Sequence, residues 1–422
     1  MRIHLAYGRE GMDIDVPDRN LLKVLTMEKG VPLPDPRGEL ENQLTRPVGG
    51  RPLAERAKEA ESACVVISDI TRPVPNRVLL PPILRTLEES RIRREDITIL
   101  VATGLHRPST PDELTVMVGK EILGLYRVID HHARIPGEQQ YLGVTSRGTP
   151  VYIDRAYCEA GLKITTGFIE PHLMAGFSGG RKLVAPGCAG EMTIKSLHSP
   201  SFLENPLCCE GSIDGNPLHH ELLEIARMAG HDFIVNVSLD VNGAITGMFA
   251  GDPEAAHAEG IAFVRGSVRS LAPTQADIVI TTSAGYPLDL TFYQSVKGIT
   301  AALPVVKQGG MLIVAARCDE GLGSPEFTSM ATAYRTVSAF VDAISANPVV
   351  IDQWQLEECA KAARLADVIL VSPNIASNFG DRLFIRTAAT VQEALAEGFR
   401  KFGPGASIAV IPKGPYTLVG VD

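Results

Sequence analysis

The chain has 422 residues, of which 45% are hydrophobic and 21% charged, and it carries a formal net charge of −9. This composition is typical of a folded globular protein with two or three domains, and it excludes global disorder. The acidic balance disfavours a nucleic-acid-binding protein, since such proteins carry a basic domain or a basic stripe.

The N-terminal sequence MRIHLAYGREGMDIDV contains no apolar core of a secretory signal. No apolar run approaches the roughly 20 residues of a membrane-spanning helix. We therefore expect a soluble cytoplasmic protein without a membrane partner. The seven cysteines are scattered and odd in number, which predicts reduced thiols rather than a disulfide framework.

Short apolar runs alternate with amphipathic stretches in the first half of the chain, which is the pattern of an α/β protein. We predict strands at 64–69, 97–104, 162–168 and 232–240. Helices are expected at 76–90, 111–119, 216–229 and 252–269. The helix at 111 has a capping hydroxyl on Thr110, a proline at its first position and two acids in its first turn.

The segment 270–277 is typical of a hinge, and the alternation restarts after it. Further strands are predicted at 277–283, 309–316, 367–373 and 406–412, and helices at 291–302, 335–346, 354–365 and 390–402. The pattern predicts two α/β domains with a cofactor- and substrate-binding cleft between them. We assign residues 1–270 to a cofactor-carrying domain and 276–404 to a second domain, with 405–422 as a candidate return to the first.

Two polar turns follow predicted strands, where open α/β sheets bind ligands. In SDITRPVPN (68–76), Asp69, Thr71 and Arg72 lie in a proline-stiffened turn, and the arginine suits a carboxylate or phosphate. An Asp–Arg surface pair is the alternative. In ATGLHRPST (102–110), Gly104 permits a sharp exit that places His106 at the end of the strand. A structural loop histidine is equally compatible with this spacing.

The stretch EPHLMAGFSGGRKLVAPG (170–187) places His172 before a glycine-rich turn and Lys182 after it. Its glycines allow backbone N–H groups to turn toward an anion. The glycine spacing is not that of a P-loop, and Leu183 stands where a hydroxyl would hold magnesium. Lys182 is a candidate anion clamp or covalent anchor, because a desolvated amine is a nucleophile.

Two later stretches carry candidate ligand-binding side chains. AGEMTIKSLHSP (189–200) predicts a short helix ending near His198. This imidazole could complete the coordination of a metal brought by an organic ligand, or simply complement the helix dipole. GYPLDLTFYQSVKG (285–298) places Tyr293, Gln294 and Lys297 at helical spacing, which suits a small carboxylate or a solvated helix face.

Taken in order, these motifs resemble those of the nickel-dependent lactate racemase family, and the resemblance covers most of the chain. It implies a nickel-pincer nucleotide, Ni(II) pyridinium-3,5-bisthiocarboxylic acid mononucleotide, joined to Lys182 as a thioamide. The nickel would be held by two sulfurs, a ring carbon and His198. Cofactor-synthesis proteins are then necessary partners.

The resemblance also implies roles for the other motif residues. His106 and His172 match the acid–base pair of the family, and Gln294 and Lys297 match the groups that hold the substrate carboxylate, beside Tyr293. Residues matched to cofactor or substrate contacts are Asp69, Ile70, Thr71 and Arg72, and we add the turn Ser178, Gly179 and Gly180 as a cofactor contact. The motif defines no role for Arg181 or Arg317.

The implied activity is racemisation or epimerisation of a 2-hydroxy acid, lactate or a relative such as malate, through a 2-oxo acid. This route avoids removing the feebly acidic α-proton. A second cation near the site would favour a dicarboxylate. The main alternative is a non-catalytic protein that binds a nucleotide or phosphorylated ligand, for which the three histidines would be incidental. A classical NAD-dependent dehydrogenase is disfavoured because no predicted strand is followed by G-x-G-x-x-G.

Overall fold

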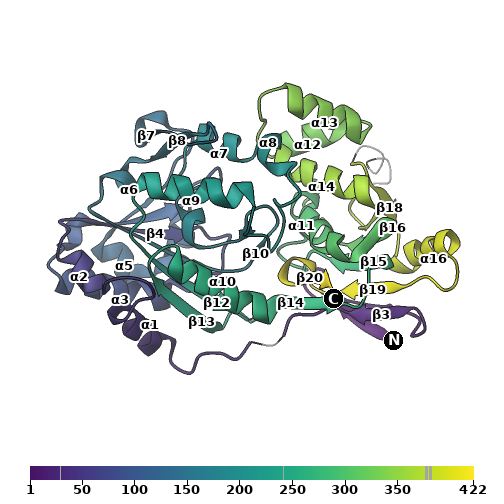
Figure 1. Ribbon diagram of the computed structural model, residues 1–422, viewed down its shortest axis with the longest axis horizontal. Helices are drawn as coiled ribbons and strands as arrows, with labels where there is room; N and C mark the ends of the chain where they lie inside the picture. Colours follow the sequence, from purple (N-terminus) through teal and green to yellow (C-terminus); the bar gives the residue numbers. More distant parts are fainter. Residues whose placement is uncertain (29, 241, 376–378, 380–382) are drawn as a thin grey trace. The chain divides into compact units, whose positions relative to one another are not determined.

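The computed structural model describes residues 1–422 except 29, 241, 376–378 and 380–382. The chain divides into two compact units (Figure 1), each built on a six-stranded sheet. Unit 1 comprises 1–28, 198–211 and 267–422, and unit 2 comprises 29–197 and 212–266. The predicted α/β class is confirmed. Among the described residues, no helix is both long and apolar enough to cross a membrane.

The sheet of unit 2 has the order β13-β12-β9-β4-β5-β6. Its strands are β4 (Ala63–Ser68), β5 (Ile97–Ala102), β6 (Arg127–Asp130), β9 (Leu162–Phe168), β12 (Phe233–Leu239) and β13 (Ile245–Gly251). All neighbouring pairs are parallel except β12 with β13. Strand β4 is buried along its whole length, which explains its uninterrupted apolar sequence ACVVIS.

Helices pack on the sheet of unit 2, and short hairpins and turns connect its elements. The helices are α1 (Pro36–Thr45), α2 (Leu53–Ala57), α3 (Asn76–Glu89), α4 (Pro111–Val118), α5 (Lys120–Leu125), α6 (Arg155–Glu159), α7 (Glu191–Leu197), α9 (Pro217–Ala229) and α10 (Ala255–Val268). The short elements are η1 (Arg94–Asp96), η2 (Pro136–Glu138), β7 (Gln139–Val144), β8 (Pro150–Asp154), β10 (Pro171–His172), β11 (Gly176–Phe177) and η3 (Gly180–Leu183). The predicted start of α4 is confirmed, since Thr110 and Glu113 form a reciprocal capping box.

Unit 1 contains a fully parallel sheet of order β18-β17-β16-β15-β19-β3. Its strands are β3 (Leu21–Val24), β15 (Ala276–Thr282), β16 (Val306–Ala315), β17 (Asp367–Val371), β18 (Arg386–Ala388) and β19 (Ile408–Ile411). Its helices are α8 (Pro200–Leu203), α11 (Phe292–Ala302), η4 (Leu303–Val305), α12 (Pro325–Ala333), α13 (Val337–Ala346), α14 (Gln353–Leu365), α16 (Val391–Phe402) and η5 (Gly414–Tyr416). Two small ribbons complete it: β1 (Arg2–Leu5) with β2 (Met12–Asp15), and β14 (Arg269–Ala272) with β20 (Leu418–Val421).

The expected domain boundaries need correction at both ends of the chain. Residues 1–28 and 405–422 group with unit 1, because β3 pairs with β19 and β20 pairs with β14. Both termini therefore lie in the same unit (Figure 1). The predicted hinge at 270–277 is also wrong in part, since its first residues continue β14 and its last begin β15. These pairings join segments that are far apart in the chain, so local sequence patterns cannot predict them.

Candidate active site

Three loops of unit 2 leave its sheet at the same edge. Strand β4 is followed by Asp69, β5 by the loop of His106, and β9 by the loop of His172. Strands β9, β4 and β5 are adjacent and parallel, so their carboxyl ends lie side by side at the same end of the sheet. The topology thus gathers three of the predicted residues where an open α/β sheet forms its site.

His106 is oriented by a buried carboxylate. Its Nδ1 lies 2.6 Å from Oδ2 of Asp69, and the His106 side chain is 57% exposed against 9% for Asp69. Thr71 donates its hydroxyl to the other carboxylate oxygen at 2.6 Å. Burial alone would raise the pKa of Asp69, but the hydrogen bonds from His106 and Thr71 and the charge of Arg72 hold it below the usual value. An ionised Asp69 requires Nδ1 of His106 to carry a proton, which leaves Nε2 as the reactive nitrogen.

The backbone around these side chains explains their placement. Gly104 has φ +55°, and its N–H donates to the carbonyl of Gly187, so the chain turns sharply out of β5 as predicted. The N–H of Arg72 donates to the carbonyl of Asp69 and closes the DITR turn. Ile70 at the tip of this turn is 39% exposed, an available apolar surface for a flat ligand.

His172 contacts Lys182 directly. It lies in a tight hairpin, where it faces Gly176 across the β10–β11 pair. Its Nδ1 accepts hydrogen bonds from the backbone N–H groups of Met174 at 3.3 Å and Ala175 at 3.2 Å. Its Nε2 lies 2.7 Å from Nζ of Lys182, which projects from η3. The two residues that flank the glycine-rich turn in sequence are therefore neighbours in space.

The glycine-rich turn is held by internal contacts. Gly179 and Gly180 have φ of +79° and +50°, and a Cβ on Gly179 would lie 2.6 Å from Oδ1 of Asn236. The N–H of Gly180 donates to that same oxygen at 2.8 Å. The hydroxyl of Ser178 donates to the carbonyl of Phe168 and accepts from the N–H of Glu170. Close packing therefore accounts for these glycines, and their contact with a cofactor stays a prediction.

The two arginines without a defined role are both engaged. Arg181 is 1% exposed and donates to the carbonyls of Ala175 at 2.8 Å and Phe177 at 3.1 Å. Burial lowers the pKa of Arg181 to about 9. Arg317, in unit 1, forms an ion pair with Asp319 at 2.9 Å.

Within unit 1, the predicted helix at 291–302 is confirmed as α11. Thr291 caps it by accepting the N–H of Gln294 at 3.3 Å. Tyr293, Gln294 and Lys297 lie on its first two turns, at the predicted i, i+3 and i, i+4 spacing. The side-chain oxygen Oε1 of Gln294 is buried and has no hydrogen-bond partner among the described residues. A buried acceptor in this state fits a donor supplied by a ligand.

His198 follows the end of α7, at the point where the chain passes from unit 2 into unit 1. Its ring lies 4.5 Å from the ring of Trp354, at an angle of 41°. Trp354 in turn donates its indole N–H to the hydroxyl of Tyr293 at 3.1 Å. The sequence analysis missed Trp354; its one signal was that it is the single tryptophan of the chain. Over the described residues, no group of three or more His, Cys, Asp or Glu side chains is placed to hold a metal ion.

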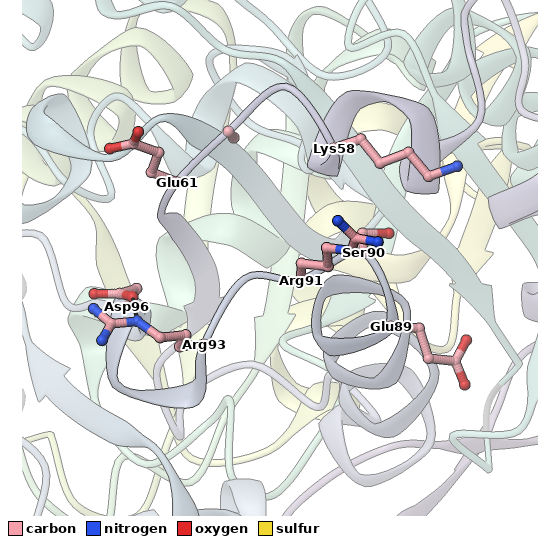
Figure 2. Close-up of a pocket in the computed structure, with 8 residues that line it drawn as sticks. Lys58, Glu61, Glu89, Ser90, Arg91, Arg93 and Asp96 are labelled. Atoms are coloured by element: carbon pink, nitrogen blue, oxygen red, sulfur yellow. Dashed lines mark hydrogen bonds and ion pairs between the residues drawn. The ribbon is translucent and has the colours of Figure 1, made fainter.

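A surface cavity of about 670 Å³ lies in unit 2, near the amino ends of β4 and β5, and Figure 2 shows its lining side chains. Its lining consists of Lys58, Ala60, Glu61, Glu89, Ser90, Arg91, Arg93 and Asp96. Three basic and three acidic side chains give it no net charge, and Arg93 is bonded to Asp96 at 2.7 Å. None of the predicted site residues lines it.

Comparison with known proteins agrees over the whole chain. Residues 7–207 match the lactate racemase N-terminal domain, and 271–419 match the lactate racemase C-terminal domain. The lactate racemase of Lactiplantibacillus plantarum is 36% identical over 387 residues, which are 90% of each chain. That of Thermoanaerobacterium thermosaccharolyticum is 32% identical over 99% of each chain.

Solved structures support the same conclusion. The lactate racemase apoprotein of T. thermosaccharolyticum superposes with a TM-score of 0.94 at 31% identity, covering 99% of this chain and 100% of that one. A Thermotoga maritima protein shares the fold, with a TM-score of 0.70 at 17% identity, over 93% of this chain and 100% of that one.

The fold and the full-length relatives define an isomerase of the racemase type. The chain belongs to the lactate racemase family. The resemblance drawn from its motifs is thereby confirmed, and membership implies a nickel-containing cofactor.

Proposed function

We propose that the protein interconverts the enantiomers of a 2-hydroxy acid, with lactate as the first candidate, by reversible oxidation to the 2-oxo acid. One observation carries the proposal. Two imidazoles lie at the carboxyl edge of the unit 2 sheet, and each has a distinct partner: His106 with Asp69, and His172 with Lys182. Lactate is the first candidate substrate because the two relatives compared above are named lactate racemase.

Racemisation needs a proton and a hydride to leave and return. When bound, the nickel-pincer nucleotide would take the hydride from the α-carbon and return it to either face of the planar 2-oxo acid. Nε2 of His106 would accept the hydroxyl proton of one enantiomer, while Asp69 stabilises the imidazolium that forms. Nε2 of His172, once it no longer contacts Lys182, would give or take the hydroxyl proton of the other enantiomer. Two acid–base groups acting on opposite enantiomers match the symmetry of a racemase reaction.

The residues present fit this cofactor. Lys182 offers an amine as attachment point, and His198 offers one imidazole nitrogen, which suffices if the other nickel donors belong to the nucleotide. We assign cofactor contacts to the turn of Asp69, Ile70 and Thr71 and to the turn of Ser178, Gly179 and Gly180. The protein would hold the substrate by its polar groups, beside the bound cofactor.

The substrate carboxylate would be held by Arg72 and Lys297, with Tyr293 and Gln294 beside it. Arginine and lysine supply the charge, and the side-chain amide N–H of Gln294 can donate to a carboxylate oxygen. Holding the carboxylate while the reacting centre reorients would present both faces of the 2-oxo acid in turn.

The two arginines without a defined role, Arg181 and Arg317, give no support to a dicarboxylate such as malate as the substrate. Arg181 is buried against backbone carbonyls, and Arg317 is paired with Asp319. Neither offers an unengaged cation for a second carboxylate. A non-catalytic nucleotide-binding protein is the rival function, but it gives no reason for a buried carboxylate to orient an exposed imidazole.

The test is to produce the protein together with the cofactor-synthesis proteins and to measure intact mass, nickel content and conversion of L-lactate to D-lactate. Lys182→Ala should lose the added mass. Lys195→Ala, at a lysine paired with Glu191 at 2.6 Å, is the matched control and should keep it. If the wild type carries neither adduct nor nickel while a known lactate racemase does so in parallel, the proposal fails. A panel of 2-hydroxy acids with chiral detection then identifies the substrate.

A further inference from the structure

We propose that His172 holds the amine of Lys182 in its neutral, nucleophilic form before the cofactor arrives, and that attachment of the cofactor releases His172 for its acid–base role. This inference rests on the proposed function, in which Lys182 is the attachment point. It means that residues of this protein prepare Lys182 for the covalent attachment of the cofactor.

The backbone selects the tautomer of His172. The N–H groups of Met174 and Ala175 both point at Nδ1, at 3.3 and 3.2 Å. A nitrogen that accepts two hydrogen bonds carries no proton, so the proton of the neutral imidazole lies on Nε2. The hairpin that positions His172 therefore also determines that Nε2 is a donor.

The contact with Nε2 of His172 favours the neutral form of the Lys182 amine. Nε2 lies 2.7 Å from Nζ, which is hydrogen-bonding distance. An ammonium group has only donors, so it cannot accept from Nε2–H. The neutral amine has a lone pair and can.

A neutral lysine is rare in water and is the form that reacts. An ordinary lysine has a pKa of about 10.4, so only on the order of one amine in a thousand is neutral near pH 7.4. Holding the neutral form removes most of this penalty for nucleophilic attack. The hydrogen bond from Nε2 must open for the attack, which costs little compared with removing a proton from an ammonium group.

Thioamide formation balances without an oxidant or reductant. The amine nitrogen bonds to the thiocarboxyl carbon, the carbon–oxygen bond breaks, and the oxygen leaves as water. One amine proton stays on nitrogen, and the other leaves in the water together with the proton of the thiocarboxylic acid. The nitrogen lone pair is then delocalised into the thioamide and no longer accepts from Nε2, so His172 becomes available to the substrate.

The proposal is tested on the cofactor-free protein by trace acetylation with acetic anhydride, followed by peptide mass spectrometry. For each lysine, the ratio of its rate at pH 7.5 to its rate at pH 10 reports the neutral fraction and cancels differences in access. We expect this ratio to be at least about tenfold higher for Lys182 than for Lys195 or Lys307, which are paired with carboxylates. Equal ratios overturn the proposal.

Two variants distinguish the effect of the Nε2–H donor on Lys182 from the effect of the hydrogen bonds that His172 accepts from the N–H groups at 174 and 175. In His172→Asn, the side-chain oxygen can take the place of Nδ1 and keep the bonds to the N–H groups at 174 and 175, but no donor reaches Lys182. In His172→Gln, an amide N–H can reach toward Lys182 while the turn contact is lost. We expect the Lys182 ratio to fall to that of Lys195 in the asparagine variant and to stay raised in the glutamine variant.

A raised ratio in the asparagine variant overturns the proposal, since it would show that the donor is not needed. The comparison of lysines within the wild type requires no variant, so it stands even if a variant folds poorly. The assay also uses neither nickel nor nucleotide. Its failure is therefore distinguishable from failure of the racemase function, which is measured by adduct mass and lactate conversion.

Discussion

Replacing Asp69 with asparagine tests how His106 acts, because it keeps the shape of the side chain and removes its charge. The hydrogen bond at 2.6 Å joins an ionised carboxylate to the imidazole. Charge-assisted bonds of this kind contribute about 1.5–3 kcal/mol, which corresponds to a roughly 10- to 150-fold effect on rate. The asparagine amide can also donate to Nδ1, which would place the proton on Nε2 and remove the base. We therefore expect kcat to fall by about 100-fold or more.

The assay follows racemisation from each enantiomer by chiral chromatography, together with single-turnover formation of the 2-oxo acid. The equilibrium constant of a racemase is one, so kcat/KM must fall equally in both directions. The asymmetry appears only in the single turnover, where oxidation of one enantiomer slows and that of the other does not. Thr71→Val is the control, since it removes a neutral bond to Asp69 and keeps the charge, and should cost only severalfold. An Asp69→Asn rate within twofold of the wild type would refute the reasoning.

Three further predictions concern separate parts of the molecule. Cofactor loading should quench the fluorescence of Trp354, the single tryptophan, because its ring contacts that of His198; the quench should vanish in His198→Ala, and an unchanged quench would rule out His198 as the nickel ligand. Gly176→Ala should lower the free energy of unfolding, measured by urea titration, by at least about 2 kcal/mol more than Gly148→Ala. Both glycines have positive φ, so the backbone strain is shared. A Cβ at 176 would lie 2.0 Å from the carbonyl oxygen of Ser212, whereas a Cβ at 148 would have nothing within 4 Å. Equal losses would mean that backbone strain alone matters. Burial, reinforced by the charge of Glu204, raises the pKa of Glu357 above its usual value, although Lys361 opposes the shift. The neutral Glu357 side chain therefore costs no stability at pH 4, and the protein loses stability as the pH rises toward 8. Glu357→Gln should exceed the wild type in free energy of unfolding by more than about 1 kcal/mol at pH 8 but not at pH 4, and a pH-independent difference would contradict this.

Much of the fold follows from local sequence, for identifiable physical reasons. Strands β4, β5, β9 and β12 were predicted because central parallel strands are buried on both faces and are continuously apolar. The start of α4 was predicted because its capping box is contained within four residues. The candidate residues at strand ends were predicted because polar groups that interrupt apolar runs mark the edge of such a sheet.

Tertiary structure decided the features that depend on distant partners. Strand β3 is a four-residue segment whose place in unit 1 is determined by its hydrogen bonds to β19, near the other end of the chain. The sequence by itself identified Asp69, His106, His172 and Lys182 as candidates, but not that they form two pairs. The contact of Trp354 with His198 was equally invisible. Hydrophobic periodicity and capping are local and leave a pattern in the sequence, whereas side-chain pairing across loops leaves none, because it depends on how the strands are ordered in the sheet.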